Sequence, residues 1–257
     1  MEDFFTTLCC GNHILMGIVG TLLTGFATGV GALPILLTTK ISERMLDALL
    51  GFAAGVMLAA TSFSLIIPAI ELGGIWPTCA GLVLGAVFLA LLDHLLPHSH
   101  FIKGKEGPSS NLRRAWLLII AITLHNFPEG LAVGVGFGAE NISDALALMI
   151  AIGLQNMPEG LAVALPLVRE KWSRGKALLY AFGSGVAEPI AGVFGVIAVT
   201  VMQPLLPWGL AFAAGAMLYV VSDEIIPETH SRGFEQEGTW GVIVGFLVMM
   251  FLDNALQ

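Results

Sequence analysis

Eight apolar stretches run through the chain, and each is long enough to cross a membrane. A spanning helix needs roughly 20 mostly apolar residues, and its backbone groups bond to one another inside the helix. Continuous apolar runs predict helices, whereas a barrel would need alternating segments of about ten residues. Hydrophobic residues make up 56% of the 257 residues and charged residues only 12%, which excludes a soluble domain. The sequence therefore predicts an all-α integral membrane protein.

The predicted spans fill the chain, so we expect one transmembrane domain over residues 1–257 with no separate soluble module. The connecting segments are short except for residues 97–114, which are polar and glycine-containing and are expected to form a mobile cytoplasmic loop. The predicted spans cover residues 14–38, 46–70, 74–96, 115–138, 144–168, 176–202, 206–228 and 238–256.

The basic residues predict the orientation in the membrane. All eleven Lys and Arg fall in alternate connections between spans: Lys40, Arg44; Lys103, Lys105, Arg113, Arg114; Arg169, Lys171, Arg174, Lys176; Arg232. The positive-inside rule places these connections in the cytoplasm, and the loops near Glu71, Glu140 and Gln203 outside. An even number of spans also puts the two termini on one side. We therefore predict a multi-pass protein of the cell (inner) membrane with both termini outside.

A repeat lies within the spans. Residues 52–58 (FAAGVML) recur at 212–218 (FAAGAML), and Ile-Ile-Pro follows each copy, at 66–68 and 225–227. The next helices share Gly81, Gly85 and Asp93 with Gly241, Gly245 and Asp253. Small residues in membrane helices look alike because close packing selects them. A seven-residue match followed by a third aligned helix is more than that tendency explains.

Helices displaced by five spans cross the membrane in opposite directions, because five is an odd number. Spans 1–3 resemble spans 6–8, with spans 4 and 5 as a matched pair between them, so the sequence predicts a 3+2+3 inverted repeat. Many secondary transporters share this construction, with the substrate site near the membrane midplane between the repeats.

Spans 4 and 5 each carry one short phrase, LHNFPEGLAV at 124–133 and LQNMPEGLAV at 154–163. An acid inside hydrocarbon is costly, so a functional site is its default interpretation. Residues three and four apart share one face of a helix. The residues that share a face are His125 and Asn126 with Glu129, and Gln155 and Asn156 with Glu159. If the two spans face each other, they supply ligands for one cation, or for two cations bridged by the carboxylates.

The proline and glycine of each phrase fit such a site. Pro128 and Pro158 donate no backbone hydrogen bond, and each ring disturbs the carbonyl four residues earlier. Gly130 and Gly160 let another backbone approach closely. Irregular backbone at membrane depth is tolerated where it is buried in protein or lines a cavity.

Further candidates lie on other spans. Glu188 precedes a proline in span 6 and could complete a second cation position. Glu71 at the outer end of span 2 is a candidate entrance, and Asp223 with Glu224 at the inner end of span 7 a candidate exit. His98 and His100 in the long loop either hand the metal on or are merely solvated. For Met57 composition alone favours a core filler, and for Asp93 and Asp253 a structural hydrogen bond competes with metal contact.

The types of donor atom in the candidate site narrow the range of metal ions that it could bind. Imidazole with carboxylates suits zinc, iron, cobalt, nickel and manganese, and a thioether extends the range towards cadmium or cuprous copper. Calcium and magnesium would be expected to use oxygen ligands alone. Neutral amides make such a site weaker than a thiolate cage, which suits an ion that must leave again.

The two Pro-Glu-Gly phrases, the Glu-Pro of span 6 and residues 223–230 (DEIIPETH) together resemble the ZIP family of divalent-metal transporters, and its GufA-like bacterial branch in particular. The resemblance covers all eight spans. It implies an eight-helix 3+2+3 fold, usually a homodimer, that moves zinc and related metals into the cytoplasm.

Position by position, the resemblance implies two adjacent metal sites and an exit route. The first site would be formed by Met57, His125, Glu129, Gln155 and Glu159. The second would be formed by Asn126, Glu129, Asn156, Glu159 and Glu188, and the exit by Asp223 and Glu224. Asn156 stands where the family often has aspartate, which removes a charge from the second site. Asp223 stands where close relatives have histidine.

The sequence predicts a transporter of divalent transition metal, zinc above all and also cadmium, iron or manganese, that works by alternating access. Spans 1, 4, 5 and 6 would move against 2, 3, 7 and 8. The expected partners are the metal ions, membrane lipid and a second copy of the chain, and no nucleic acid. The alternatives are a metal-selective channel and a proton-coupled carrier of another solute. An intramembrane metalloprotease would need His-Glu-x-x-His on one helix, a motif that the sequence lacks, so we expect no enzyme.

Overall fold

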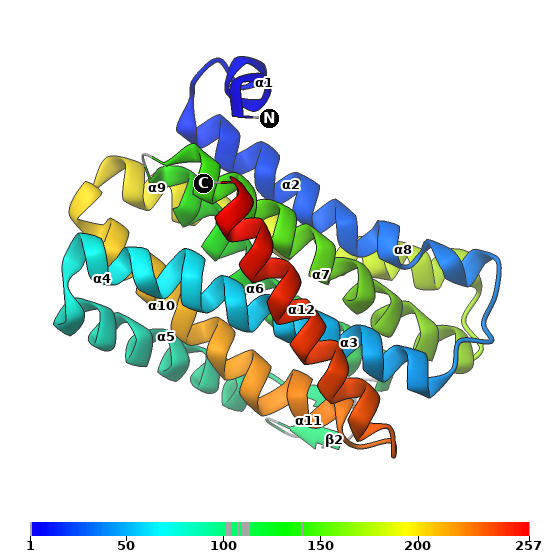
Figure 1. Cartoon of the computed structure of the whole chain (residues 1–257). Helices are drawn as coiled ribbons and strands as arrows, with labels where there is room; N and C mark the ends of the chain where they lie inside the picture. Colours follow the sequence, from blue (N-terminus) through cyan, green and yellow to red (C-terminus); the bar gives the residue numbers. More distant parts are fainter. Residues whose placement is uncertain (1, 101–103, 107, 109–113, 140, 257) are drawn as a thin grey trace.

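The computed structural model describes residues 2–100, 104–106, 108, 114–139 and 141–256, and within them it has eight helical segments long and apolar enough to cross a membrane (Figure 1). The predicted number of spans is thereby confirmed. The predicted loop residues Lys103 and Arg113, and Glu140, lie outside the described residues. The spans are His13–Leu36, Glu43–Gly73, Ile75–Leu95, Ile119–Gly138, Ile142–Arg169, Arg174–Val201, Gln203–Thr229 and Glu235–Ala255.

Several spans contain more than one helical element. The α-helices are α1 (Glu2–Leu8), α2 (His13–Gly31), α3 (Glu43–Ala60), α4 (Ile67–Gly73), α5 (Ile75–Leu95), α6 (Arg114–Gly138), α7 (Ile142–Arg169), α8 (Arg174–Ser184), α9 (Ala187–Val201), α10 (Leu206–Val220), α11 (Ile226–Thr229) and α12 (Glu235–Leu256). The short 3₁₀ segments are η1 (Leu33–Leu36) and η3 (Gln203–Leu205). The π-helical segments are η2 (Thr61–Ile66) and η4 (Val221–Ile225).

Polar side chains start four of the long helices. Asn12, Ser42, Asn141 and Ser173 each accept a hydrogen bond from a backbone N–H in the first turn of α2, α3, α7 and α8, respectively. Such caps satisfy donors that have no partner inside the helix. They fix where these helices begin in the chain.

Proline has two different effects in the spans. Pro68 and Pro227 are the second residues after the π-helical segments η2 and η4, respectively. A proline lacks an N–H and crowds the carbonyl four residues earlier, so an extra residue is accommodated as a π-bulge. Pro128 and Pro158, by contrast, lie inside α6 and α7, and both helices continue through them.

Glycines set the closest helix crossings in the bundle. A Cβ atom on Gly85 of α5 would lie 1.9 Å from the carbonyl oxygen of Phe212 on α10. A Cβ atom on Gly245 of α12 would lie 2.0 Å from the carbonyl oxygen of Phe52 on α3. Backbones approach this closely only where the side chain is absent. α5 therefore packs tightly on α10, and α12 on α3, while α7 is the most buried span and α5 and α12 are the least buried.

Part of the predicted long loop forms a short hairpin, which the sequence analysis did not predict. β1 (His98–His100) and β2 (Gly104–Glu106) form an antiparallel hairpin, with His98 opposite Glu106. β1 packs against α6. The contact anchors the hairpin to the span that carries the first phrase.

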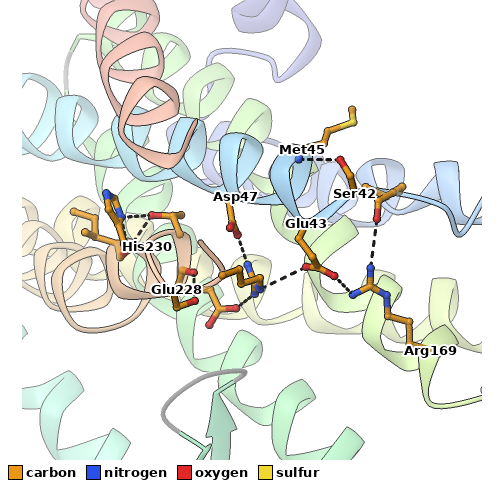
Figure 2. Close-up of polar contacts among 12 residues, drawn as sticks. Ser42, Glu43, Met45, Asp47, Arg169, Glu228 and His230 are labelled. Atoms are coloured by element: carbon orange, nitrogen blue, oxygen red, sulfur yellow. Dashed lines mark hydrogen bonds and ion pairs between the residues drawn. The ribbon is translucent and has the colours of Figure 1, made fainter. Parts of the chain in front are cut away.

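One end of the bundle holds a network of ion pairs that includes Arg169 and Arg232 (Figure 2). We call it the basic end. Arg232 pairs with Asp47 and Glu228, and its Nε lies 3.5 Å from Glu43. Glu43 also pairs with Arg169, at the end of α7. Glu43 thus joins α7 to the connection between α11 and α12.

The crossing between α5 and α10 can be tested with one methyl group. We expect Gly85→Ala to lower the melting temperature of the protein in detergent, because overpacking a tight contact costs about 1–3 kcal/mol. Gly183→Ala on α8 is the matched control, since no atom lies within 4 Å of the Cβ position there. Equal melting temperatures for the two variants would contradict the crossing described.

Candidate metal site within the membrane

The two phrases come together between α6 and α7. Gln155 on α7 donates from Nε2 to Oε1 of Glu129 on α6, at 2.7 Å. Both residues are fully buried, and Glu159, one turn after Gln155, is 6% exposed. The carboxylates of the phrases therefore lie in the interior of the bundle.

Glu188 joins this cluster from α9. Asn156 donates from Nδ2 to Oε1 of Glu188 at 2.7 Å and to the carbonyl oxygen of Thr24 at 3.0 Å. The hydroxyl of Thr28 donates to the same carboxylate oxygen at 3.5 Å. α2, α7 and α9 thus meet at one carboxylate. Thr24 and Thr28 were not among the predicted site residues, although their spacing of four places both on one face of α2.

The local sequence explains how these helices approach so closely. A Cβ atom on Gly130 would lie 2.2 Å from the carbonyl oxygen of Glu188, and one on Gly160 1.7 Å from that of Thr28. The glycine of each phrase is thus the point where a second backbone passes, as the sequence predicted. Span 6 is interrupted between α8 and α9, just before Pro189, so Glu188 lies in the first turn of α9. The positive end of that helix favours a carboxylate there.

Many polar atoms of this cluster have no hydrogen-bond partner among the described residues. Buried polar groups nearly always have one, and an exception needs an explanation. All but one of the unsatisfied atoms in the cluster are oxygens, which accept hydrogen bonds or bind cations. The oxygens are Oδ1 of Asn126, Oε2 of Glu129, Oε1 of Gln155, Oδ1 of Asn156, both carboxylate oxygens of Glu159 and Oε2 of Glu188. The arrangement suits a cation.

The other two predicted ligands of the first metal position, Met57 and His125, make different contacts from the cluster of amides and carboxylates. Met57 is fully buried on α3, in the hydrophobic cluster that also contains Ala132 and Val133 of α6. His125 contacts the carboxylate of Glu224 in η4 through Nε2. The imidazole of His125 thus contacts a residue of the predicted exit. Within the described residues, no three His, Cys, Asp or Glu side chains are already arranged to hold a metal ion.

His98 lies at the basic end and is not solvated. Its side chain is buried, its Nε2 lies 2.7 Å from Oδ1 of Asp93, and its Nδ1 lies 2.8 Å from the carbonyl oxygen of Leu96. Burial lowers the pKa of His98, but the hydrogen bond and negative charge of Asp93 outweigh it, so the pKa is raised overall. The alternative of a merely solvated histidine is therefore wrong for His98. The side chain of His100 lies outside the described part of the structure.

A cavity opens at the opposite end of the bundle. It measures about 730 Å³, and Glu71, Ser64, Asp144 and Gln203 are among its lining residues. Ser64 donates to Oδ1 of Asp253 at 2.8 Å. Glu71, the predicted entrance residue, thus lines a cavity at the end away from the basic residues.

Comparison with known proteins identifies the family. A family model described as ZIP Zinc transporter matches residues 98–253. The zinc transporter GufA of Myxococcus xanthus is 46% identical over 93% of this chain and 98% of its own length. The zinc transporter ZIPB of Bordetella bronchiseptica is 43% identical over 95% of this chain and 82% of its own. The human zinc transporter ZIP11 is 38% identical over 95% of this chain and 98% of its own length. The chain belongs to the ZIP family, as the motifs predicted.

Removing one carboxylate charge tests the cluster as a cation site. We expect Glu129→Gln, which keeps the shape of the side chain, to weaken zinc binding to the purified protein at least about tenfold. Loss of groups that only support a metal ligand already costs about 10–100-fold. Equilibrium dialysis with zinc measures the change. Glu235→Gln, the same substitution at an exposed position of α12, is the control, and equal affinities for both variants would contradict the assignment.

Proposed function

We propose that this protein carries divalent transition metal ions, zinc above all, across the membrane into the cytoplasm. The observation that carries the proposal is the set of unsatisfied oxygens contributed by α6, α7 and α9 within the bundle. Named relatives that match over nearly the whole chain are zinc transporters, which supports the same function. Cadmium, iron and manganese are further candidate cargoes.

The proposed ion positions share two carboxylates. Met57, His125, Glu129, Gln155 and Glu159 would form the first position. Asn126, Glu129, Asn156, Glu159 and Glu188 would form the second. Gln155 and Asn156 now donate their N–H groups to carboxylates, whereas each amide oxygen has no partner among the described residues. An arriving cation would find these oxygens available, and His125 would turn from Glu224 to reach it.

The donor set supports transition metals over calcium and magnesium. An imidazole and a thioether beside carboxylates suit zinc and its neighbours, and the thioether also suits cadmium. Calcium and magnesium sites use oxygen ligands. Three buried carboxylates, those of Glu129, Glu159 and Glu188, would supply negative charge for a divalent ion.

Packing supports the proposed 3+2+3 inverted repeat. The two tight crossings are related by the repeat, because Gly85 corresponds to Gly245 and Phe212 to Phe52. A second set agrees: a Cβ atom on Gly55 would lie 2.0 Å from the carbonyl oxygen of Val242, and one on Gly215 1.9 Å from that of Leu82. Each copy also has a π-helical segment before its Ile-Ile-Pro. Equivalent contacts at equivalent positions are what a two-fold relation produces.

The charges support the proposed orientation in the cell (inner) membrane. The positive-inside rule puts the basic end in the cytoplasm and both termini outside. The cavity lined by Glu71 then faces outside, and Glu224 lies on the route towards the basic end. We also propose that the protein is a homodimer, on the family resemblance.

Contacts at the basic end support alternating access by two helix groups. The ion pair between Glu43 and Arg169 joins α3 of the proposed group 2, 3, 7, 8 to α7 of the group 1, 4, 5, 6. Beside it, Leu46 and Leu50 of α3 pack with Ala162 and Leu165 of α7. These contacts close the basic end, and movement of the groups would have to break them.

Breaking this link should open the basic end more often. We expect Arg169→Gln to make a cysteine introduced at Leu165 react up to about fivefold faster with a water-soluble thiol reagent. An exposed ion pair is worth at most about 1 kcal/mol, which sets that limit. The background has serine at Cys9, Cys10 and Cys79. Arg44→Gln breaks the pair with Glu237 within one group and is the control; the same rate in both variants would contradict a link between groups.

Zinc uptake tests the proposed function itself. We expect proteoliposomes with the protein to take up radioactive zinc, and Glu129→Ala combined with Glu159→Ala to abolish the uptake, because both ion positions lose their shared ligands. Uptake unaffected by the double substitution would refute the site. A flux that saturates with zinc concentration and is accelerated by zinc on the far side indicates a carrier, whereas a channel would show no such acceleration. Parallel assays with cadmium, iron and manganese rank the cargoes.

A further inference from the structure

A cavity of about 470 Å³ lies at the basic end, where α7 ends and α8 begins. It is separate from the metal site between α6, α7 and α9. The described lining includes two positively charged residues and no acidic one. The lining residues are Lys171, Trp172, Ser173, Lys176, Leu179 and Tyr180. The charges alone indicate an anionic ligand.

The backbone at Lys171 is unusual. Its φ angle is +67°, in the left-handed region that a side chain disfavours. Lys171 N–H bonds to the carbonyl of Val168 and Trp172 N–H to that of Leu167, which is the Schellman motif that ends α7. Glycine usually occupies this position because it has no Cβ atom.

The start of α8 adds partial positive charge. Ser173 caps the helix by accepting from the N–H of Lys176, at 3.4 Å. The first N–H groups of a helix have no partner within it, and its dipole favours an anion there. Lys176 lies on the first turn of this helix and Lys171 just before the cap, so two full charges flank the same helix end.

Aromatic rings form one wall of the cavity. Tyr180 packs edge-on against Trp172 and against Trp116 of α6, with ring centroids 5.1 Å apart in both pairs. Trp and Tyr gather at the depth of the lipid headgroups in membrane proteins. Leu179 is 68% exposed and lies beside the lysines in the lining. The cavity thus combines a cationic part at headgroup depth with an apolar residue that can contact an acyl chain.

We propose that this cavity binds the headgroup phosphate of an anionic phospholipid. Lys171, Lys176 and the start of α8 would hold the phosphate, and Leu179 would contact the first part of an acyl chain. A lysine or arginine close to a bound anionic headgroup contributes about fivefold in affinity, and more distant ones contribute less because salt screens them. The binding is independent of metal transport and does not rest on the proposed function.

The experiment measures lipid binding to the intact protein. Full-length protein in neutral detergent is titrated with phosphatidylglycerol or phosphatidylcholine, and bound lipid is counted by native mass spectrometry. We expect the wild type to prefer phosphatidylglycerol. The double substitution Lys171→Gly with Lys176→Gln should weaken phosphatidylglycerol binding by about 25-fold, that is, about fivefold per lysine. Lys171→Gly places glycine where the backbone favours it, so the melting temperature should not fall.

Controls separate this site from general charge effects. Lys40→Gln removes an exposed lysine of the basic end outside the cavity and should leave phosphatidylglycerol binding unchanged. Arginine at both 171 and 176 keeps the charges and should retain binding, even if the neutral double variant folds poorly. Equal weakening by Lys40→Gln, or no preference for phosphatidylglycerol in the wild type, would overturn the proposal. Displacement of the lipid by millimolar inorganic phosphate would also overturn it, in favour of a site for free phosphate.

Discussion

The cost of burying carboxylates inside a membrane governs the centre of this molecule. Glu129, Glu159 and Glu188 lie within the bundle, away from water. An ionised carboxylate is stable in the interior of a protein only where hydrogen-bond donors or positive charges surround it. Gln155, Asn156 and Thr28 satisfy some of the oxygens, and the others have no hydrogen-bond partner among the described residues. The helices can hold these partly hydrogen-bonded carboxylates only because Gly130 and Gly160 let neighbouring backbones come close.

Amide side chains suit this arrangement because one amide can donate a hydrogen bond to a carboxylate and can also bind a cation through its oxygen. An amide presents N–H donors on one side and an oxygen acceptor on the other. Donating to Glu129 and Glu188, as Gln155 and Asn156 do here, relieves repulsion between carboxylates. Accepting a cation, the same groups would become ligands after a rotation of the amide. An aspartate at 156 would add negative charge but could not donate. At the proposed second position, Asn156 would bind metal more weakly than an aspartate, but its N–H group stabilises Glu188 when no metal is bound.

Local sequence patterns predicted much of the structure, and long-range contacts account for the rest. Hydrophobic runs gave the eight spans, and the Pro-Glu-Gly phrases indicated the helices of the candidate site. Helix periodicity places His125 on the face of Glu129, yet its imidazole contacts Glu224, about a hundred residues later, which no local pattern reveals. The contribution of Thr24 and Thr28 was missed because threonine is common in membrane helices. The hairpin of β1 and β2 was missed because its polar, glycine-containing sequence resembles a loop and its packing against α6 is a long-range contact.

The ion pairs at the basic end differ in a way that fits their places in the bundle. Asp47 is completely buried where it pairs with Arg232, and both residues belong to the proposed group of spans 2, 3, 7 and 8. Separating such a pair would leave a buried charge alone, which is strongly destabilising. Arg169 and Glu43, which link the two proposed groups, have side chains 45% and 35% exposed. Water can replace each partner at little cost. If the two proposed groups move against each other, the ion pair between them is therefore the weaker one, and the stronger pair stays within one group.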